Sequence, residues 1–168
     1  MKKIKGFTLI EFLIYMGIMA IFLVVMTNIF TSILNTQSEA EVTSSVQQDG
    51  SYILARLMHD INNADLINNP TLGNSASVLS VKVNSIDYNY FIYNNNLVLS
   101  NNLGTDIPLN SSGTTISNFT VQRFGNVVAI PYPTNPKNTL KISFTVTSEV
   151  TQLKGLETRN FETTVGIR

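Results

Sequence analysis

The feature that most constrains this chain is an apolar run near its N-terminus. Residues 7–26 read FTLIEFLIYMGIMAIFLVVM and contain one acidic or basic side chain, Glu11. About 20 mainly apolar residues in a helix can cross a bilayer, whereas the apolar core of a secretory signal is shorter, about 10–14 residues. Lys2, Lys3 and Lys5 precede the run, and positive flanks stay in the cytoplasm. The sequence therefore predicts a retained transmembrane helix, residues 7–34, with the N-terminus inside and the remaining chain outside.

Glu11 is the costly residue of this segment. A carboxylate near the middle of a spanning helix costs roughly 2.5–3.5 kcal/mol on insertion scales, and less near the interface. In one interpretation Glu11 lies at the interface and its carboxylate reaches water. In the other, the carboxylate meets a cation when subunits pack together. No Lys or Arg lies between Phe7 and Asn35, so that cation would come from another molecule or from a new N-terminus.

The junction between the lysines and the apolar run resembles a known signal. The stretch GFTLIE at residues 6–11, preceded by a short Lys-rich leader, resembles the class III signal peptide of type IV pilins. The resemblance implies that a prepilin peptidase cuts between Gly6 and Phe7, removes residues 1–6 and methylates the new N-terminal Phe7. It also implies that Glu11 acts in subunit assembly, by pairing with the α-amino group of a neighbouring subunit's Phe7.

One departure from the family pattern is informative. Many major pilins have a helix-breaking Pro later in this segment, but the first Pro of this chain is Pro70. Because Pro removes a backbone donor and kinks a helix, its absence predicts an unbroken helix. This weakly disfavours a major-subunit role.

Residues 35–67 are predicted to continue the helix as an amphipathic segment. Apolar residues recur at helical spacing on one stripe, formed by Val42, Val46, Ile53, Leu57, Ile61 and Ala64. Gly50 interrupts the stripe at a tolerable cost of about 1 kcal/mol relative to Ala. The helix is predicted to end at about Leu66, because residues 68–74 contain Pro and Gly. Its apolar stripe must cover a sheet.

Residues 68–168 are predicted to form an antiparallel β globular domain. Alternating or β-rich segments lie at 86–93, 97–99, 119–124, 140–147 and 156–167, with turns at Asn94–Asn96 and near Lys154-Gly155. Pro131, Pro133 and Pro136 mark a loop. The predicted fold class is α+β, with one long N-terminal helix packed on an antiparallel sheet.

The order of segments after the helix adds to the resemblance. Residues 47–64, then a Tyr-rich strand, an Asn turn and a short return strand, are similar to the J-type minor pseudopilins of type II secretion systems and the W-type minor pilins. This similarity is a pattern over most of the chain rather than a sharp motif. It implies a subunit that acts in initiation of a filament or at its tip.

Candidate catalytic and metal-binding residues are few. Asp60 lies off the apolar stripe, and adjacent helical residues point about 100° apart, so His59 and Asp60 are not expected to form a dyad. His59 is predicted to be a lone surface histidine. The chain has no Cys, which excludes disulfides and Cys-ligated metal. Asp65, Asp87 and Asp106 have no calcium-loop spacing and are predicted to lie in solvated loops.

Nucleic-acid binding has weak support. Lys plus Arg and Asp plus Glu are 11 each, so the net charge is zero. The aromatic strand residues Tyr88, Tyr90, Phe91 and Tyr93 have one nearby cation, Lys82, and are predicted to serve packing rather than base stacking. A weakly basic C-terminal portion, formed by Lys137, Lys141, Lys154, Arg159 and Arg168, is predicted to be a solvated face.

The predicted function is that of a minor pilin or pseudopilin subunit, which is not an enzyme and needs no cofactor, metal or small-molecule substrate. By resemblance, its partners are the prepilin peptidase, other pilin or pseudopilin subunits, an assembly-platform membrane protein and, before assembly, membrane lipid. Its location would be the cytoplasmic (inner) membrane and then a pilus or pseudopilus. The alternatives are a membrane-anchored binding module, such as a pilus-tip adhesin or DNA-uptake receptor, and a single-pass protein with an uncleaved signal anchor.

Overall fold

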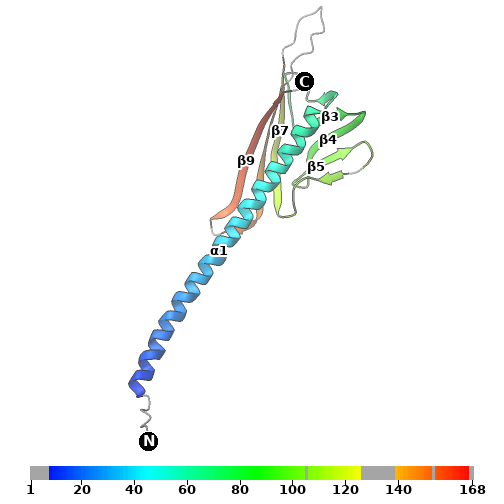
Figure 1. Cartoon of the computed structure of the whole chain (residues 1–168). Coiled ribbons are helices and arrows are strands. Elements are labelled where there is room, and N and C mark those ends of the chain that lie inside the picture. The colour runs from blue at the N-terminus through cyan, green and yellow to red at the C-terminus, as the bar shows by residue number, and fades with distance from the viewer. Residues whose placement is uncertain (1–7, 105, 126–138, 153, 167–168) are drawn as a thin grey trace, which may run out of the picture. The chain divides into compact units, whose positions relative to one another are not determined.

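The computed structural model of the chain describes residues 8–104, 106–125, 139–152 and 154–166. These residues form one long helix, α1 (Leu9–Asn62), followed by strands β1 to β9 (Figure 1). The chain divides into two compact units, Met1–Ala40 and Glu41–Arg168. The first unit is helical wherever it is described beyond Thr8.

The second unit contains two antiparallel sheets. The larger has the order β1-β3-β4-β5-β6, and the smaller has the order β2-β7-β8-β9. The strands are β1 (Leu66–Asn69), β2 (Ser75–Ala76), β3 (Leu79–Val83), β4 (Ile86–Tyr93), β5 (Asn96–Asn101), β6 (Asp106–Pro108), β7 (Thr114–Phe124), β8 (Thr139–Gln152) and β9 (Gly155–Gly166). The predicted α+β class is confirmed, but the strands form two sheets rather than one. The predicted proline loop at 131–136 lies outside the described residues.

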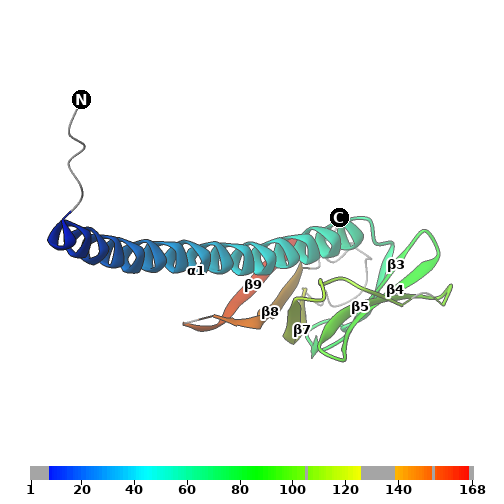
Figure 2. The ribbon, with the colours of Figure 1, turned by 90° about the horizontal axis from the view of Figure 1, so that it is seen from below.

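The second half of α1 lies along one face of the sheets (Figure 2). The predicted apolar stripe is confirmed, because Val42, Val46, Ile53, Leu57 and Ile61 are all buried. The same core takes residues from both sheets: Leu79, Val81, Tyr90, Leu97 and Leu99 from the larger, and Ile116, Val121, Leu140, Ile142, Phe144, Val146 and Phe161 from the smaller. One hydrophobic core therefore joins the helix to both sheets.

Strand alternation in the smaller sheet follows the sequence. Every second residue of β8 from Leu140 to Val146 is buried, and β9 returns beside β8 in antiparallel register. Gly155 begins β9 with a φ of 103°, a conformation that costs Gly little. The predicted strand pair and its turn are confirmed.

The aromatic hairpin also forms, with a tighter turn than predicted. Asn94 and Asn95 have φ values of 48° and 61°, as a two-residue type I′ turn requires. Tyr93 pairs with Asn96, so Asn96 already belongs to β5. Asn is among the few non-glycine residues that adopt this left-handed conformation readily, which explains the choice of residues.

The helix ends four residues earlier than predicted, at Asn62 rather than Leu66. The side-chain amide of Asn63 donates a hydrogen bond of 2.8 Å to the carbonyl of His59, which is one of the last carbonyls of the helix. Two residues after Asn63, the backbone N–H of Asp65 donates to the carbonyl of Lys82, where the sheet begins. Side-chain capping and strand pairing therefore outweigh the helical pattern before the Pro-Gly segment is reached.

Candidate functional site

The described start of α1 is closed by a reciprocal pair of hydrogen bonds. The backbone N–H of Thr8 donates to Glu11 Oε2 at 3.2 Å, and the backbone N–H of Glu11 donates to Thr8 Oγ1 at 3.4 Å. The Thr8 hydroxyl also donates to the same Oε2 at 3.1 Å. This is a capping box, in which the side chains at both ends of the first turn satisfy backbone donors that the helix leaves open.

The capping box was not foreseen from the sequence, although its signal was present. The spacing Thr-x-x-Glu ahead of an apolar run is the pattern of a capping box. The Glu11 carboxylate is therefore a hydrogen-bond acceptor at the helix start as well as a charge. The predicted site residue Glu11 thus lies at the helix N-terminus, where a carboxylate is also favoured by the helix dipole. Gly6 and Phe7 lie outside the described residues, so the cleavage and methylation site stays a prediction.

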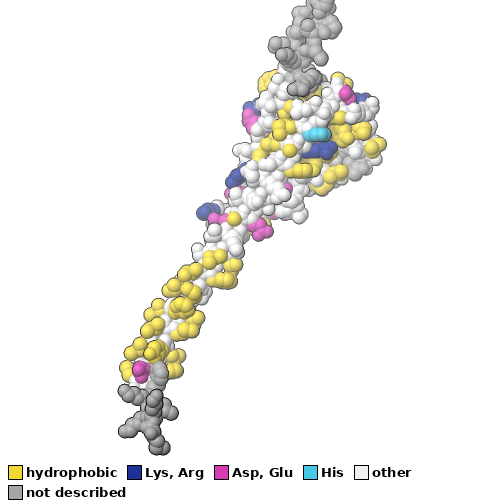
Figure 3. Space-filling model, viewed as in Figure 1, with side chains coloured by type: hydrophobic (Ala, Val, Ile, Leu, Met, Phe, Trp, Pro, Cys, Tyr) yellow, Lys and Arg dark blue, Asp and Glu magenta, His cyan; other side chains and the backbone are white. Residues whose placement is uncertain are grey.

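The helix that follows exposes apolar side chains on every side. Large hydrophobic residues from Leu9 to Met26 are 43–79% exposed within this unit, and Figure 3 shows hydrophobic side chains along its length. Among the described residues, α1 is the one helix long and apolar enough to cross a membrane by length and composition. A helix that is apolar all round must be covered by lipid or by other helices.

Past Met26 the helix carries hydroxyl side chains that bond to its own backbone. Thr27 donates to the carbonyl of Leu23 at 2.8 Å, and Thr31 donates to the carbonyl of Thr27 at 3.1 Å. Such bonds to the carbonyl four residues earlier satisfy the hydroxyl without water. These polar residues are therefore compatible with an apolar surrounding.

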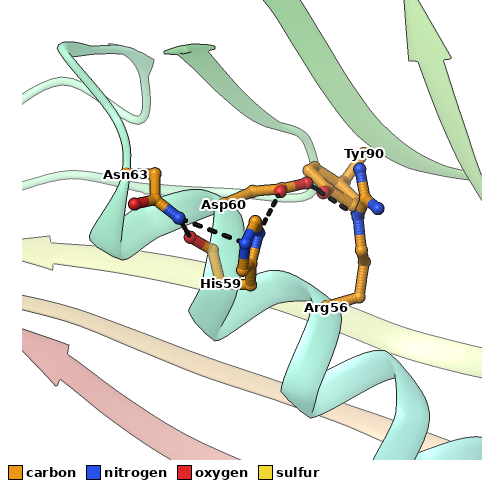
Figure 4. Close-up of polar contacts among 5 residues, drawn as sticks. All are labelled: Arg56, His59, Asp60, Asn63 and Tyr90. Carbon is orange, nitrogen blue, oxygen red and sulfur yellow. Dashed lines mark hydrogen bonds and ion pairs between the residues drawn. The ribbon is translucent and has the colours of Figure 1, made fainter.

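A polar cluster centred on Asp60 joins α1 to β4 (Figure 4). The Asp60 carboxylate is 4% exposed; it accepts from Arg56 Nε at 2.9 Å and from the Tyr90 hydroxyl. His59 Nδ1 lies 3.0 Å from Asp60 Oδ1, while the His59 side chain is 70% exposed. The expectation of a surface His59 is confirmed. The expectation that adjacent positions keep His59 and Asp60 from forming a dyad is wrong, because their side chains are in contact, and the placement of Asp60 off the buried stripe is also wrong.

The electrostatics of this cluster keep the Tyr90 hydroxyl protonated and the Arg56 guanidinium charged. Burial raises the pKa of the Tyr90 hydroxyl well above its usual value, and the neighbouring Asp60 carboxylate raises it further. Burial alone would lower the pKa of Arg56, but the contacts with Tyr90 and Asp60 outweigh burial and raise it. Tyr90 therefore stays a hydrogen-bond donor and Arg56 stays charged. The cluster fastens the helix to the sheet and has the character of a structural contact.

A second carboxylate of the helix holds a loop. Asp49 Oδ2 accepts from the backbone N–H of Ser111 at 2.9 Å, from its hydroxyl at 2.7 Å and from the Thr114 hydroxyl. Next to it, the buried Asn110 side chain accepts from the backbone N–H of Leu97 at 3.1 Å and donates to the carbonyl of Thr114 at 2.7 Å. These contacts connect α1 with the segment between the two sheets.

Gly50 is required by close packing rather than merely tolerated. A Cβ built on Gly50 would lie 2.1–2.4 Å from three ring atoms of Phe161 in β9. Real Cβ atoms essentially never approach so closely. The interpretation of Gly50 as an interruption of the stripe is therefore wrong, because its missing side chain is what lets the helix approach the sheet.

Within the described part of the chain, the other candidate side chains do not come together into a metal site or a base-stacking platform. The described residues contain no group of three or more His, Cys, Asp and Glu side chains that could hold a metal ion. Tyr90 is fully buried and cannot stack on a base. Lys141 pairs with Glu162 at 2.8 Å, and Arg159 pairs with Glu157 at 3.0 Å, so each of these two cations already has an anionic partner. Lys137 and Arg168 lie outside the described residues.

The comparison with known proteins concerns the N-terminal segment. Residues 1–27 match the family described as the prokaryotic N-terminal methylation motif. The chain carries a type IV pilin-like N-terminus. No curated protein and no solved structure matches the chain significantly. The type IV pilin-like motif ends at residue 27, so the similarity of residues 47–64 to J-type or W-type subunits stays a prediction.

The motif and the structure of the first unit agree with each other. A class III signal is processed by prepilin peptidase, and in this chain it leads directly into an apolar, capped helix. The type IV pilin-like segment therefore supplies both a processing signal and a surface for membrane insertion or helix packing. Both are consistent with a membrane-anchored pilin-like protein.

Proposed function

We propose that this chain is a minor pilin or pseudopilin subunit. Prepilin peptidase cuts it after Gly6 and methylates Phe7, and the processed subunit stays in the cytoplasmic membrane with its globular unit outside. It then joins a type IV pilus or a type II secretion pseudopilus, in the initiating complex or at the tip. Its role is structural and needs no cofactor.

The observation that carries this proposal is a carboxylate at the start of a helix whose first part, from Leu9 to Met26, is otherwise free of charge and lies within a methylation motif. Glu11 is the one acidic or basic side chain from residue 6 to residue 38, so its charge has no partner in this part of its own chain. Processing creates a cation at the same end of the helix, the α-amino group of Phe7. Pairing between Glu11 of one subunit and Phe7 of the next satisfies both charges when helices pack together.

A minor role is supported by the lack of a helix breaker. Helix α1 contains no Pro, and its hydroxyl residues Thr27 and Thr31 are satisfied within the helix. The helix therefore has no proline at which it would be kinked or broken. A subunit that starts a filament or caps it need not adapt to the repeated lattice of the major subunit.

The proposed partners follow from this cycle. The prepilin peptidase and the assembly-platform membrane protein act on the membrane-bound subunit, and other pilin or pseudopilin subunits contact its helix in the filament. The alternative of an adhesin or DNA-uptake receptor has less support. A DNA receptor needs an open cationic surface, and Lys141 and Arg159 are each engaged by a glutamate.

The test combines the mass of the mature N-terminus with assembly of a Glu11 variant. The mature wild-type subunit is expected to begin with an N-methylated Phe7. Glu11→Ala is expected to be cut normally but to accumulate in the membrane fraction and to be depleted from sheared filaments. Glu41→Ala, which removes another exposed carboxylate of α1, is the matched control and should assemble normally.

Two results would contradict the proposal. A mature protein that retains Met1 would identify an uncleaved signal anchor. Normal incorporation of Glu11→Ala would show that the carboxylate is not the assembly contact.

A further inference from the structure

The turn end of the β8–β9 hairpin carries two exposed aliphatic side chains. Val150 of β8 and Leu156 of β9 are each 51% exposed, whereas the other apolar residues of these two strands are buried. Thr151, next to Val150, pairs with Leu156 across the hairpin, so both side chains lie in its last pairs of residues. Together they form a small apolar surface, called here the hairpin tip (residues 150–152 and 154–156).

A bulge in β8 holds Val150 in its exposed position. The register of β8 with β9 shifts just before the hairpin tip. The buried Ser148 hydroxyl accepts from the backbone N–H of Val150 at 3.0 Å and donates to its carbonyl at 3.1 Å. The N–H of Glu149 donates to the carbonyl of Gly113 at 2.9 Å. Because bulges redirect side chains, these bonds fix the exposure of Val150 in the folded backbone.

The hairpin tip lies at the end of the second unit where α1 enters it. Contacts of α1 with β9 follow the same order along both elements, namely Met58 with Thr163, Gly50 with Phe161 and Gln47 with Arg159. Lower residue numbers in β9 therefore lie beside lower residue numbers in α1. The hairpin tip precedes Arg159 in β9, so it lies toward Glu41, the first residue of the second unit.

This end of the second unit is tied closely to the apolar part of the helix. The last large exposed hydrophobic residue before Glu41 is Leu34, seven residues earlier. Seven helical residues span about 10 Å, and this length limits the separation whatever direction the second unit takes. The headgroup layer on each side of a bilayer is roughly 5–8 Å thick. The Glu41 end is therefore the part of the second unit that can reach the surface of a membrane crossed by the helix.

The charges around the hairpin tip suit a lipid surface without net charge. Residues 149–159 contain two acidic side chains, Glu149 and Glu157, and two basic ones, Lys154 and Arg159. Glu157 and Arg159 pair with each other at 3.0 Å. A polybasic segment would favour anionic lipid, but a balanced one adds no such preference. The apolar side chains therefore remain as the main source of attraction.

We propose that the hairpin tip docks on the membrane that anchors the subunit, with Val150 and Leu156 inserted among the lipid headgroups. The inference rests on the proposed function for the membrane anchoring of the subunit. Docking removes two half-exposed aliphatic side chains from water, which is favourable at the boundary between headgroups and acyl chains. It gives the globular unit a fixed resting position on the membrane before assembly.

The experiment uses the full chain in phosphatidylcholine vesicles and measures tryptophan fluorescence. The chain has no Trp, so each single-Trp variant reports on one position. Val150→Trp and Leu156→Trp place the probe in the hairpin tip. Leu103→Trp is the matched control, because Leu103 is 74% exposed and follows the end of β5 that lies level with β1, just after α1 ends. Brominated phosphatidylcholine quenches a Trp that contacts lipid.

The two tip probes are expected to be quenched by brominated lipid and to emit at shorter wavelength than the Leu103→Trp control, which should keep its fluorescence. Because Trp itself favours the membrane interface, a second reporter tests the native side chains. Thr151→Trp is compared with and without the pair Val150→Ser and Leu156→Ser. Loss of both aliphatic side chains should shift the ratio of docked to free tip about tenfold toward the free state, so quenching of the Thr151→Trp reporter should largely disappear.

Flotation of the vesicles separates this inference from the proposed function. If the chain floats with the vesicles but the tip probes are quenched no more than the Leu103→Trp control, docking is refuted and membrane anchoring stands. Equal quenching of the Thr151→Trp reporter with and without the two Ser substitutions would also refute docking through Val150 and Leu156. A chain that does not float with the vesicles would refute the anchoring itself and the docking with it.

Discussion

Replacing Gly50 by Ala is expected to destabilise the globular unit, although the same change stabilises most helices. Gly in a helix interior is about 1 kcal/mol less favourable than Ala, so helix propensity alone predicts a gain of that size. At this position the added methyl group meets the ring of Phe161, with three contacts of 2.1–2.4 Å. The structure therefore reverses the sign of the prediction from propensity.

The size of the effect follows from how firmly the ring is held. Phe161 is 8% exposed and stacks on Phe144, with ring centroids 5.5 Å apart and an interplanar angle of 14°. The nearest contact would have to grow from 2.1 Å to at least 3.4 Å, so either Phe161 must leave its stacked position or the helix must lift from the sheet. Overpacking costs about 1–3 kcal/mol, and the upper end applies to such a clash. After the gain in propensity, the net loss is about 2 kcal/mol.

Thermal unfolding of the full chain in detergent micelles, followed by near-ultraviolet circular dichroism, measures this loss. A net change of about 2 kcal/mol lowers the Tm of a unit of this size by roughly 8 °C. Gly113→Ala is the control, because a Cβ at Gly113 has no atom within 4 Å. In a Phe161→Leu background, Gly50→Ala should become neutral or stabilising. An unchanged or higher Tm for Gly50→Ala in the wild-type background would refute the close approach of helix and sheet.

Three further predictions concern the polar contacts of the globular unit. Tyr90→Phe should lower the free energy of unfolding, measured by denaturant titration, by about 1–3 kcal/mol, because the buried Asp60 loses a hydrogen-bond donor. Tyr93→Phe is the control, because Tyr93 is exposed and its replacement should leave the free energy of unfolding unchanged. Because the pKa of Tyr90 is raised in the folded state, stability is fully present below about pH 10, the pKa of an unfolded Tyr, and should decline above it. That alkaline decline should be weaker in Tyr90→Phe, and an equal decline would assign it to other groups. Asp49→Ala should lower the free energy of unfolding by about 1–3 kcal/mol, because Ser111 loses its hydrogen bonds to the helix, whereas Glu41→Ala should cause no measurable change. Equal denaturation midpoints for the two variants would show that Asp49 does not hold the loop.

Local periodicity was sufficient to predict the helix and the strands β4, β5, β8 and β9, but not the short strands β1, β2, β3 and β6 or the polar contacts between elements. The buried stripe from Val42 to Ile61 and the alternation in β8 are repeats within one element, so the sequence displays them directly. The burial of Asp60 depends on Tyr90, which lies 30 residues further along the chain on another element. The spacing within the helix, seven residues after Ile53 and three after Leu57, is that of the buried face, and only the charge of Asp60 led to its assignment to the polar face.

Gly50 shows the same limit in a different way. Its partner Phe161 lies in the last strand, and the need for Gly appears only when the helix is placed against that strand. The capping box at Thr8 is the opposite case, because all its groups lie within four residues and the spacing was visible in the sequence. Contacts between distant elements can be identified only in the structure, whereas the capping box can be predicted from the Thr-x-x-Glu spacing alone.

The apolar surface of the first unit bears on the proposed role of Glu11 in assembly. Between Leu9 and Met26, fifteen large hydrophobic side chains are at least 43% exposed. If covering the exposed part of each stabilises the chain by about 1 kcal/mol, the total is on the order of 15 kcal/mol, which equals or exceeds the stability of a typical domain. This helix therefore cannot remain in water.

The free energy gained by covering these apolar side chains nevertheless does not favour a filament over a membrane. Lipid tails are as apolar as Leu, so moving the helix from lipid to other helices gains little hydrophobic energy. The choice then depends on packing and on polar contacts that lipid does not offer. In the proposed filament, the bond between the Glu11 carboxylate and a neighbouring amine is such a contact. A residue that contributes a few kcal/mol at most can thus decide where a much larger apolar surface resides.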